Sequence, residues 1–175
     1  MNDWLKWSVT PALVCAGTWP SYATTYLTQE QAQQAIFPGQ KLFPTPLKLT
    51  DAQRKAIENA SGVRVRDLEP KVWRVEGGGW FLLDEVLGKH EFITYALGLN
   101  ADGSVKQVEV MDYRETYGDG IRNVKWRSQF VGKTSKSKLK LDDDIKNITG
   151  ATLSCRHITD GVKRLLALYD LALKN

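Results

Sequence analysis

The clearest periodic pattern of apolar residues lies at the C-terminal end of the chain. Beyond Ser154, apolar side chains recur at the spacing i, i+4, i+7, i+8, i+11 and i+14, at Ile158, Val162, Leu165, Leu166, Tyr169 and Ala172. This spacing is typical of one face of an α-helix. We therefore expect a long amphipathic helix that packs on a core.

The middle of the chain alternates between strand-like segments and turn residues. Runs rich in β-branched, aromatic and aliphatic residues cover 63–65, 71–76, 80–86, 91–99 and 106–113. The segments 77–79 and 100–103 have the composition of hairpin turns. In 92–99 the polar and apolar residues no longer alternate, which indicates a central strand covered on both faces. The pattern predicts an antiparallel sheet.

Two shorter helices are predicted before the sheet. Residues 28–37 have helical composition and end at Pro38-Gly39, and 51–60 follow Thr50, a suitable N-cap. With the C-terminal helix, these elements predict a single α+β domain in which helices pack on an antiparallel sheet.

Residues 1–23 have the features of a secretory signal peptide. Lys6 precedes an apolar centre at 11–17, and Ser21-Tyr22-Ala23 has the small-x-small pattern of a cleavage site. The apolar centre is too short to span a bilayer. We expect export to the periplasm or another extracytoplasmic compartment, with an uncleaved leader acting as an interfacial anchor as the alternative.

Composition and charge narrow the functional class. The chain is 25% charged and 42% hydrophobic, which is ordinary for a globular protein. Its densest basic patch, 133–140, interleaves lysine with serine and threonine rather than with aromatic residues, so nucleic-acid binding is not indicated. The patch is either a solvated face or a docking site for an acidic redox partner or an anionic membrane surface. With only His90 and His157 as histidines and no Cys-x-x-Cys-His spacing, no metal or haem site is predicted.

A motif with chemistry of its own precedes the C-terminal helix. Residues 149–154 read Thr-Gly-Ala-Thr-Leu-Ser. The first turn of a helix has unpaired N–H groups and a partial positive charge, and the small residues Thr149, Gly150 and Ala151 would let a phosphate approach closely. The alternative is an ordinary helix start with no ligand.

This motif resembles the S/T-G-A-T-x-S/T signature of the FMN-binding domain family. That family includes one subunit of the sodium-translocating NADH:quinone reductase, one subunit of the Rnf complex and small periplasmic flavoproteins. The resemblance implies a phosphoester, made by a flavin transferase, between FMN and Thr152, with Leu153 and Ser154 also at the cofactor. Lys146 departs from the family pattern D-x-x-S/T-G-A-T, in which Asp is usual at that position.

A second stretch carries the same resemblance. Residues 115–118, Glu-Thr-Tyr-Gly, and the later Trp126 with 130–132 are similar to an E-T-x-G loop and a W…F-x-G segment of the family. The loop is chemically suited to the edge of a flavin: Glu115, Thr116 and the backbone amides near Gly118 and Gly120 can hydrogen-bond the ring heteroatoms, and we expect Trp126 or Phe130 against the ring. Two alternatives are open: Trp126 and Phe130 are four residues apart, as in a packed helix, and Glu115 has arginine neighbours for a salt bridge.

The combined interpretation divides the chain into a signal peptide (1–23), an N-terminal helical segment (24–70) and an FMN-binding domain (71–175). We expect an extracytoplasmic electron carrier with covalent FMN rather than a stand-alone enzyme, because no catalytic triad or carboxylate pair accompanies the motifs. Its expected partners are a flavin transferase and a cytochrome or membrane oxidoreductase. The alternatives are a non-covalent FMN or phosphate-ligand module, and an accessory subunit of a membrane redox complex.

Overall fold

The computed structural model describes residues 24–115 and 117–174. The predicted signal peptide and the predicted flavin contact Thr116 lie outside the described residues.

One six-stranded antiparallel sheet, ordered β1-β6-β5-β4-β3-β2, organises the described chain. Four consecutive strands form its centre as a meander: β3 (Lys71–Val75), β4 (Trp80–Leu87), β5 (Phe92–Leu99) and β6 (Val105–Tyr113). Two short N-terminal strands, β1 (Thr24–Thr25) and β2 (Leu42–Pro44), pair with β6 and β3 at opposite edges. The N-terminal segment is thus part of the same sheet.

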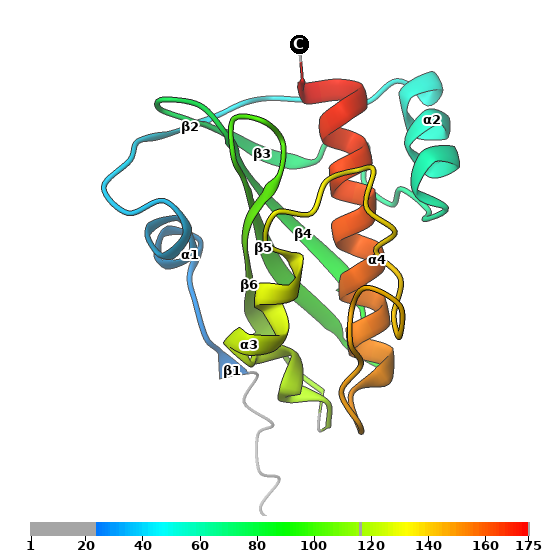
Figure 1. Cartoon of the computed structure of the whole chain (residues 1–175). Helices are drawn as coiled ribbons and strands as arrows, with labels where there is room; N and C mark the ends of the chain where they lie inside the picture. The colour runs from blue at the N-terminus through cyan, green and yellow to red at the C-terminus, as the bar shows by residue number, and fades with distance from the viewer. Residues whose placement is uncertain (1–23, 116, 175) are drawn as a thin grey trace, which may run out of the picture.

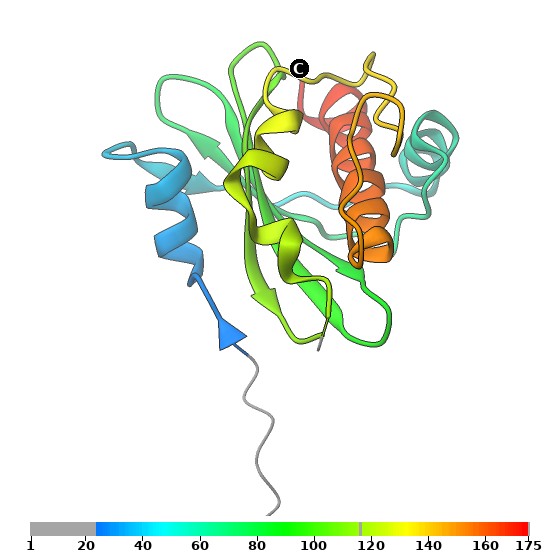
Figure 2. The same cartoon turned by 60° about the horizontal axis from the view of Figure 1, so that its bottom comes forward.

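Helices cover both faces of the sheet (Figures 1 and 2). The long α4 (Thr152–Leu168) crosses one face with α2 (Asp51–Ser61) beside it, and α1 (Gln29–Ile36) lies on the other. Shorter turns follow β6: η1 (Asp119–Arg122), α3 (Val124–Arg127) and η2 (Ser128–Phe130), and a π-helical turn, Tyr169–Leu173, extends α4. None of the described helices combines the length and the apolar character needed to cross a membrane.

The apolar stripe of α4 packs as its spacing predicts. Five of its six residues are buried in the larger core, between α4, α2 and the sheet, and Ala172 packs partly buried at its margin. A smaller core lies under α1. Between them, β5 is buried on both faces, as predicted: Tyr95 belongs to the larger core and Ala96 to the smaller. At Gly98 an added Cβ would lie 2.2 Å from Ile36, so glycine lets α1 pack directly on the strand.

Residues 63–65 do not form the predicted strand, and this prediction is wrong. The backbone groups of this segment are bound by side chains instead of a neighbouring strand: the Val65 N–H donates to the Glu58 carboxylate, and the Arg64 carbonyl accepts from Arg164. The segment is a loop that closes over the end of the core, with the Val65 side chain buried.

A cleft at the start of the C-terminal helix

Three segments far apart in the sequence enclose a cleft of about 460 Å³. They are the β4–β5 turn, the loop after β6 and the first turn of α4, which meet at the lower end of the molecule in Figure 1. The volume lies in the range of small-molecule sites. The lining residues are Lys89, His90, Glu115, Tyr117, Gly150, Ala151, Thr152, Leu153 and Ser154.

The first turn of α4 has no side-chain cap, unlike the other two long helices. Both α1 and α2 begin in a capping box built on threonine, whereas the N-cap of α4 is Ala151, which makes no side-chain hydrogen bond. Gly150, at φ 84°, turns the chain into the helix, and the Ala151 carbonyl accepts from the Cys155 N–H. The N–H groups of the first turn are therefore available to an anion, and the helix dipole favours negative charge there.

Tyr113 joins the end of β6 to the start of α4. Its hydroxyl donates to the Tyr117 carbonyl and lies 3.1 Å from the Ser154 hydroxyl, which therefore donates to it. Desolvation raises the pKa of Tyr113, with the Ser154 hydrogen bond acting against it. At Gly118, with φ 97°, an added Cβ would lie 2.6 Å from the Tyr113 hydroxyl oxygen and 3.1 Å from that of Ser154. Only glycine fits, and this packing holds the loop against the helix.

Glu115 lines the cleft, but its carboxylate is directed at the β4–β5 turn. One oxygen accepts from the backbone N–H groups of His90 (2.6 Å) and Glu91 (3.0 Å). Desolvation raises the pKa of Glu115, but these bonds to the ionised form outweigh it, and the pKa lies below its usual value. The carboxylate thus positions the turn that forms one wall of the cleft, and the described arginines make no salt bridge with it.

Trp126 does not line the cleft. Its side chain is 4% exposed, its ring meets Phe130 edge to face at 5.2 Å, and its indole N–H donates to the Lys146 carbonyl at 2.7 Å. The structure thus supports the alternative from the four-residue spacing, that these aromatic rings pack in the core. Trp126 contributes to the site indirectly, because its hydrogen bond to Lys146 holds the backbone that leads into the motif at 149–154.

The remaining motif residues divide between the cleft and its surroundings. Thr152 and Leu153 are exposed in the cleft, while Ser154 is buried and hydrogen-bonded to Tyr113. Thr149 is exposed and does not line the cleft. Gly118 supports the wall from behind.

The sequence interpretation missed the wall formed by Lys89, His90 and Tyr117, and the role of Tyr113. The sequence did contain a signal that places Lys89 and His90 at the site. Because 80–86, 91–99 and 106–113 were expected as consecutive antiparallel strands, the turn before 91 and the loop after 113 fall at the same end of the sheet. Residues 88–90 were therefore candidates for the site from topology alone.

The basic patch at 133–140 is partly neutralised. Lys133 pairs with Asp144 at 2.8 Å and Lys138 with Asp143 at 3.2 Å. These contacts favour the interpretation of the patch as a solvated face over that of a docking site.

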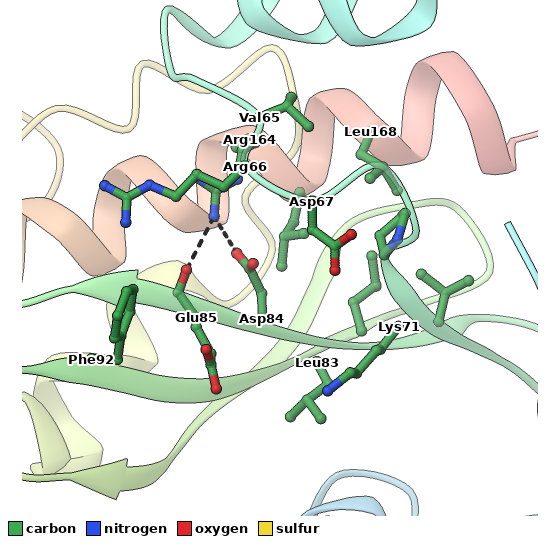
Figure 3. A pocket seen from close by; sticks show the side chains of 14 residues that line it. Val65, Arg66, Asp67, Lys71, Leu83, Asp84, Glu85, Phe92, Arg164 and Leu168 are labelled. Carbon is green, nitrogen blue, oxygen red and sulfur yellow. Dashed lines mark hydrogen bonds and ion pairs between the residues drawn. The ribbon is translucent and has the colours of Figure 1, made fainter. Parts of the chain in front are cut away.

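A second cavity, of about 260 Å³, lies between α4, β3, β4, β5 and the loop 65–70 (Figure 3). Arg164 on α4 extends to Asp84 and to the Glu85 carbonyl on β4, and its guanidinium lies 2.5 Å from the Asp84 carboxylate. Tyr95 also donates to this carboxylate, at 2.6 Å. Since these buried charges satisfy one another and no motif residue lines the cavity, we interpret it as part of the core structure.

Comparison with known proteins agrees with the geometry of the first cleft. Residues 88–167 match the FMN-binding domain family, and this range contains every residue that lines the cleft. The chain is also 30% identical over 82 residues to a subunit of the Na(+)-translocating ferredoxin:NAD(+) oxidoreductase complex of Acetobacterium woodii, a match that covers 42% of this chain and 40% of that relative. The resemblance inferred from the two motifs is confirmed: residues 88–167 match the FMN-binding domain family, and this match supports FMN as the cofactor.

Proposed function

We propose that this protein is an extracytoplasmic electron-transfer flavoprotein that carries FMN through a phosphoester bond to Thr152. The observation that supports this most directly is the position of Thr152: its side chain is exposed in the cleft, in the uncapped first turn of α4. When bound, FMN supplies the redox chemistry, and the protein supplies attachment, orientation and electrostatics.

The groups around Thr152 suit a phosphodiester. Such a group keeps one negative charge, which the N-terminus of α4 stabilises. Lys89 in the opposite wall adds positive charge to the cleft, and the exposed Arg156 follows one helical turn beyond Thr152, outside the lining residues. Tyr117 and Leu153 are 84% and 42% exposed at the cleft, where they offer apolar surface to the flavin ring.

The cleft is suited to holding a cofactor rather than to transforming a separate substrate. One oxygen of its carboxylate, Glu115, accepts from two backbone N–H groups, and among the described lining residues no hydrogen-bonded acid–base pair is set up for proton transfer. Electron transfer through the bound flavin needs no such pair. This supports a carrier or redox subunit rather than a stand-alone enzyme.

The proposed partners follow from the relative and from the leader. The relative is named as part of a sodium-translocating ferredoxin:NAD(+) oxidoreductase complex. By analogy, this chain would pass electrons to or from a membrane oxidoreductase or a cytochrome, after export by the predicted signal peptide at 1–23 and modification by a flavin transferase.

Intact-protein mass spectrometry after denaturation tests the attachment. The chain is produced with a flavin transferase as wild type, Thr152→Ala and Thr149→Ala. Thr149 is the matched control because it is an exposed threonine of the same motif outside the cleft. We expect wild type and Thr149→Ala to gain the mass of one FMN less one water, and Thr152→Ala to gain nothing. Retention of this mass in Thr152→Ala would exclude Thr152 as the attachment site.

Non-covalent FMN binding is the second candidate, favoured by Lys146 in place of the usual Asp. It predicts an unmodified mass for wild type while the transferase modifies another target. In that case, added FMN should bind the folded protein and raise its Tm.

A further inference from the structure

The side-chain amide of Asn147 links the backbone before the motif to the hydroxyl of Thr152. Its NH₂ group donates to Thr152 Oγ1 at 3.0 Å, and its carbonyl oxygen accepts from the Ile148 N–H at 2.8 Å. Because only the oxygen of the amide can accept from a backbone N–H, the second bond fixes which end points at Thr152. The threonine oxygen therefore receives a donor of defined position.

The backbone that carries Asn147 is itself held on both sides. The Lys146 N–H donates to the Gln129 side chain and the Lys146 carbonyl accepts from Trp126, both at 2.7 Å. The Lys146 side chain is exposed. Lys146, at the position where the family usually has Asp, thus makes these contacts through its main chain. The side-chain hydrogen bond to Thr152 comes from the next residue, Asn147.

We propose that Asn147 is a positioning residue that orients the Thr152 hydroxyl for phosphoester formation. This inference rests on the proposed function. Threonine has few χ1 rotamers because it is β-branched, and a fixed donor to Oγ1 selects among them. The hydroxyl oxygen is then held in place in the cleft before the flavin donor arrives.

A donor at this position suits both the free and the modified threonine. The FMN donor would be a flavin nucleotide activated as a phosphoric anhydride. Oγ1 forms a bond to the phosphorus on the flavin side of the anhydride, the P–O bond to the nucleotide leaving group breaks, and the hydroxyl proton passes to the leaving phosphate or to solvent. Asn147 uses only one lone pair of Oγ1, so another is free to attack. The resulting ester oxygen is still an acceptor, and the neutral amide does not repel the phosphodiester, whereas a carboxylate would.

Two substitutions separate this role from simple support of the loop. Asn147→Asp keeps an acceptor for the Ile148 N–H but has no donor for Thr152 and adds a negative charge. Asn147→Ala removes both contacts and adds no charge. The matched control is Asn123→Asp, because Asn123 also accepts from a backbone N–H, that of Lys125, at the start of α3.

The measurement is the rate at which purified, unmodified full-length chain gains FMN mass with transferase and flavin donor, with the Tm of each variant measured alongside. We expect Asn147→Asp and Asn147→Ala to be modified about tenfold more slowly, the effect of losing one hydrogen bond of ordinary strength. Asn123→Asp should be modified at the wild-type rate, and Asn147→Asp should keep the wild-type Tm.

The remaining outcomes overturn the inference. A wild-type rate in Asn147→Asp with a slow rate in Asn147→Ala would mean that Asn147 only supports the loop. A wild-type rate in Asn147→Ala with a slow rate in Asn147→Asp would mean that the added charge alone has an effect. If wild type itself gains no FMN while the transferase modifies another target, the proposed function fails. If wild type is modified and both Asn147 variants keep its rate, only this inference fails.

Discussion

The ion pair between Asp84 on β4 and Arg164 on α4 allows the sharpest prediction about stability. We consider Asp84→Ala. The Arg164 guanidinium lies 2.5 Å from the Asp84 carboxylate, and the side chains of Arg164 and Asp84 are 9% and 21% exposed. Tyr95, which is fully buried, donates to the same carboxylate at 2.6 Å. The substitution removes the counter-charge of a buried cation and the acceptor of a buried phenol in one step.

The expected loss follows from the charge that is left behind. Breaking a buried ion pair by removing one partner costs about 3–5 kcal/mol of unfolding free energy, because the other charge stays desolvated and uncompensated. For a domain of this size, that corresponds to a Tm lower by about 10 °C. Replacing both partners, as in Asp84→Leu with Arg164→Met, should cost less than the single change, because no buried charge remains. A residual cost of about 2 kcal/mol is expected, since the buried Tyr95 hydroxyl loses its acceptor and the Arg64 carbonyl loses its donor.

The assay is urea unfolding of wild type, the single variant and the double variant, followed by tryptophan fluorescence. An Asp84→Ala protein within about 1 kcal/mol of wild type, or a double variant less stable than the single one, would refute the reasoning. Arg164 lies twelve residues after Thr152 in α4, about 18 Å along the helix at 1.5 Å per residue. Variants that still fold should therefore gain FMN mass like wild type.

Two further predictions concern the walls of the cleft. Gly118→Ala should lower the free energy of unfolding by about 2–3 kcal/mol, because φ is positive and the new Cβ displaces the Tyr113 hydroxyl. The control Gly132→Ala, with φ 77° and no atom within 4 Å of its new Cβ, should lower it by only the backbone part, about 1–2 kcal/mol. Equal losses of the two variants in urea unfolding would exclude a contribution from the contact with Tyr113. Folding lowers the pKa of Glu115, so the ionised carboxylate stabilises the fold at every pH above the usual pKa of 4.5. This contribution is lost as the pH falls through the lower pKa of the folded state. Glu115→Gln should thus be less stable than wild type at pH 7 by about 1 kcal/mol, with the difference shrinking toward pH 3; a difference that does not change with pH would contradict the assignment.

Local signals in the sequence were sufficient for most of the fold. Thr50 and Gln53 form the capping box that starts α2, and the turns 77–79 and 100–103 join β3 to β4 and β5 to β6 as expected. The short strands β1 and β2 had no such signal. They have two and three residues, and β2 ends in proline, so their pairing with the sheet determines their conformation rather than any pattern of their own.

The candidate site was predictable only in part. The motif at 149–154 fixes the start of α4, because its chemistry is local. The directions of Glu115 and Trp126 were not predictable, since each is determined by a partner distant in sequence: the turn at His90 for Glu115, and the Lys146 carbonyl for Trp126. The contact of Asn147 with Thr152 depends in turn on that held backbone.

The two short edge strands have a consequence for how copies of this protein meet at high concentration. An exposed strand edge invites another chain to pair with it. On one side, β2 ends in Pro44, which has no N–H to donate. On the other, beyond β1, the segment 127–133 covers β6: Val105 exchanges hydrogen bonds with Lys133 and Gly132, and Arg127 donates to the Val108 carbonyl. In the described part of the chain, both edges of the sheet are thereby poor templates for aggregation.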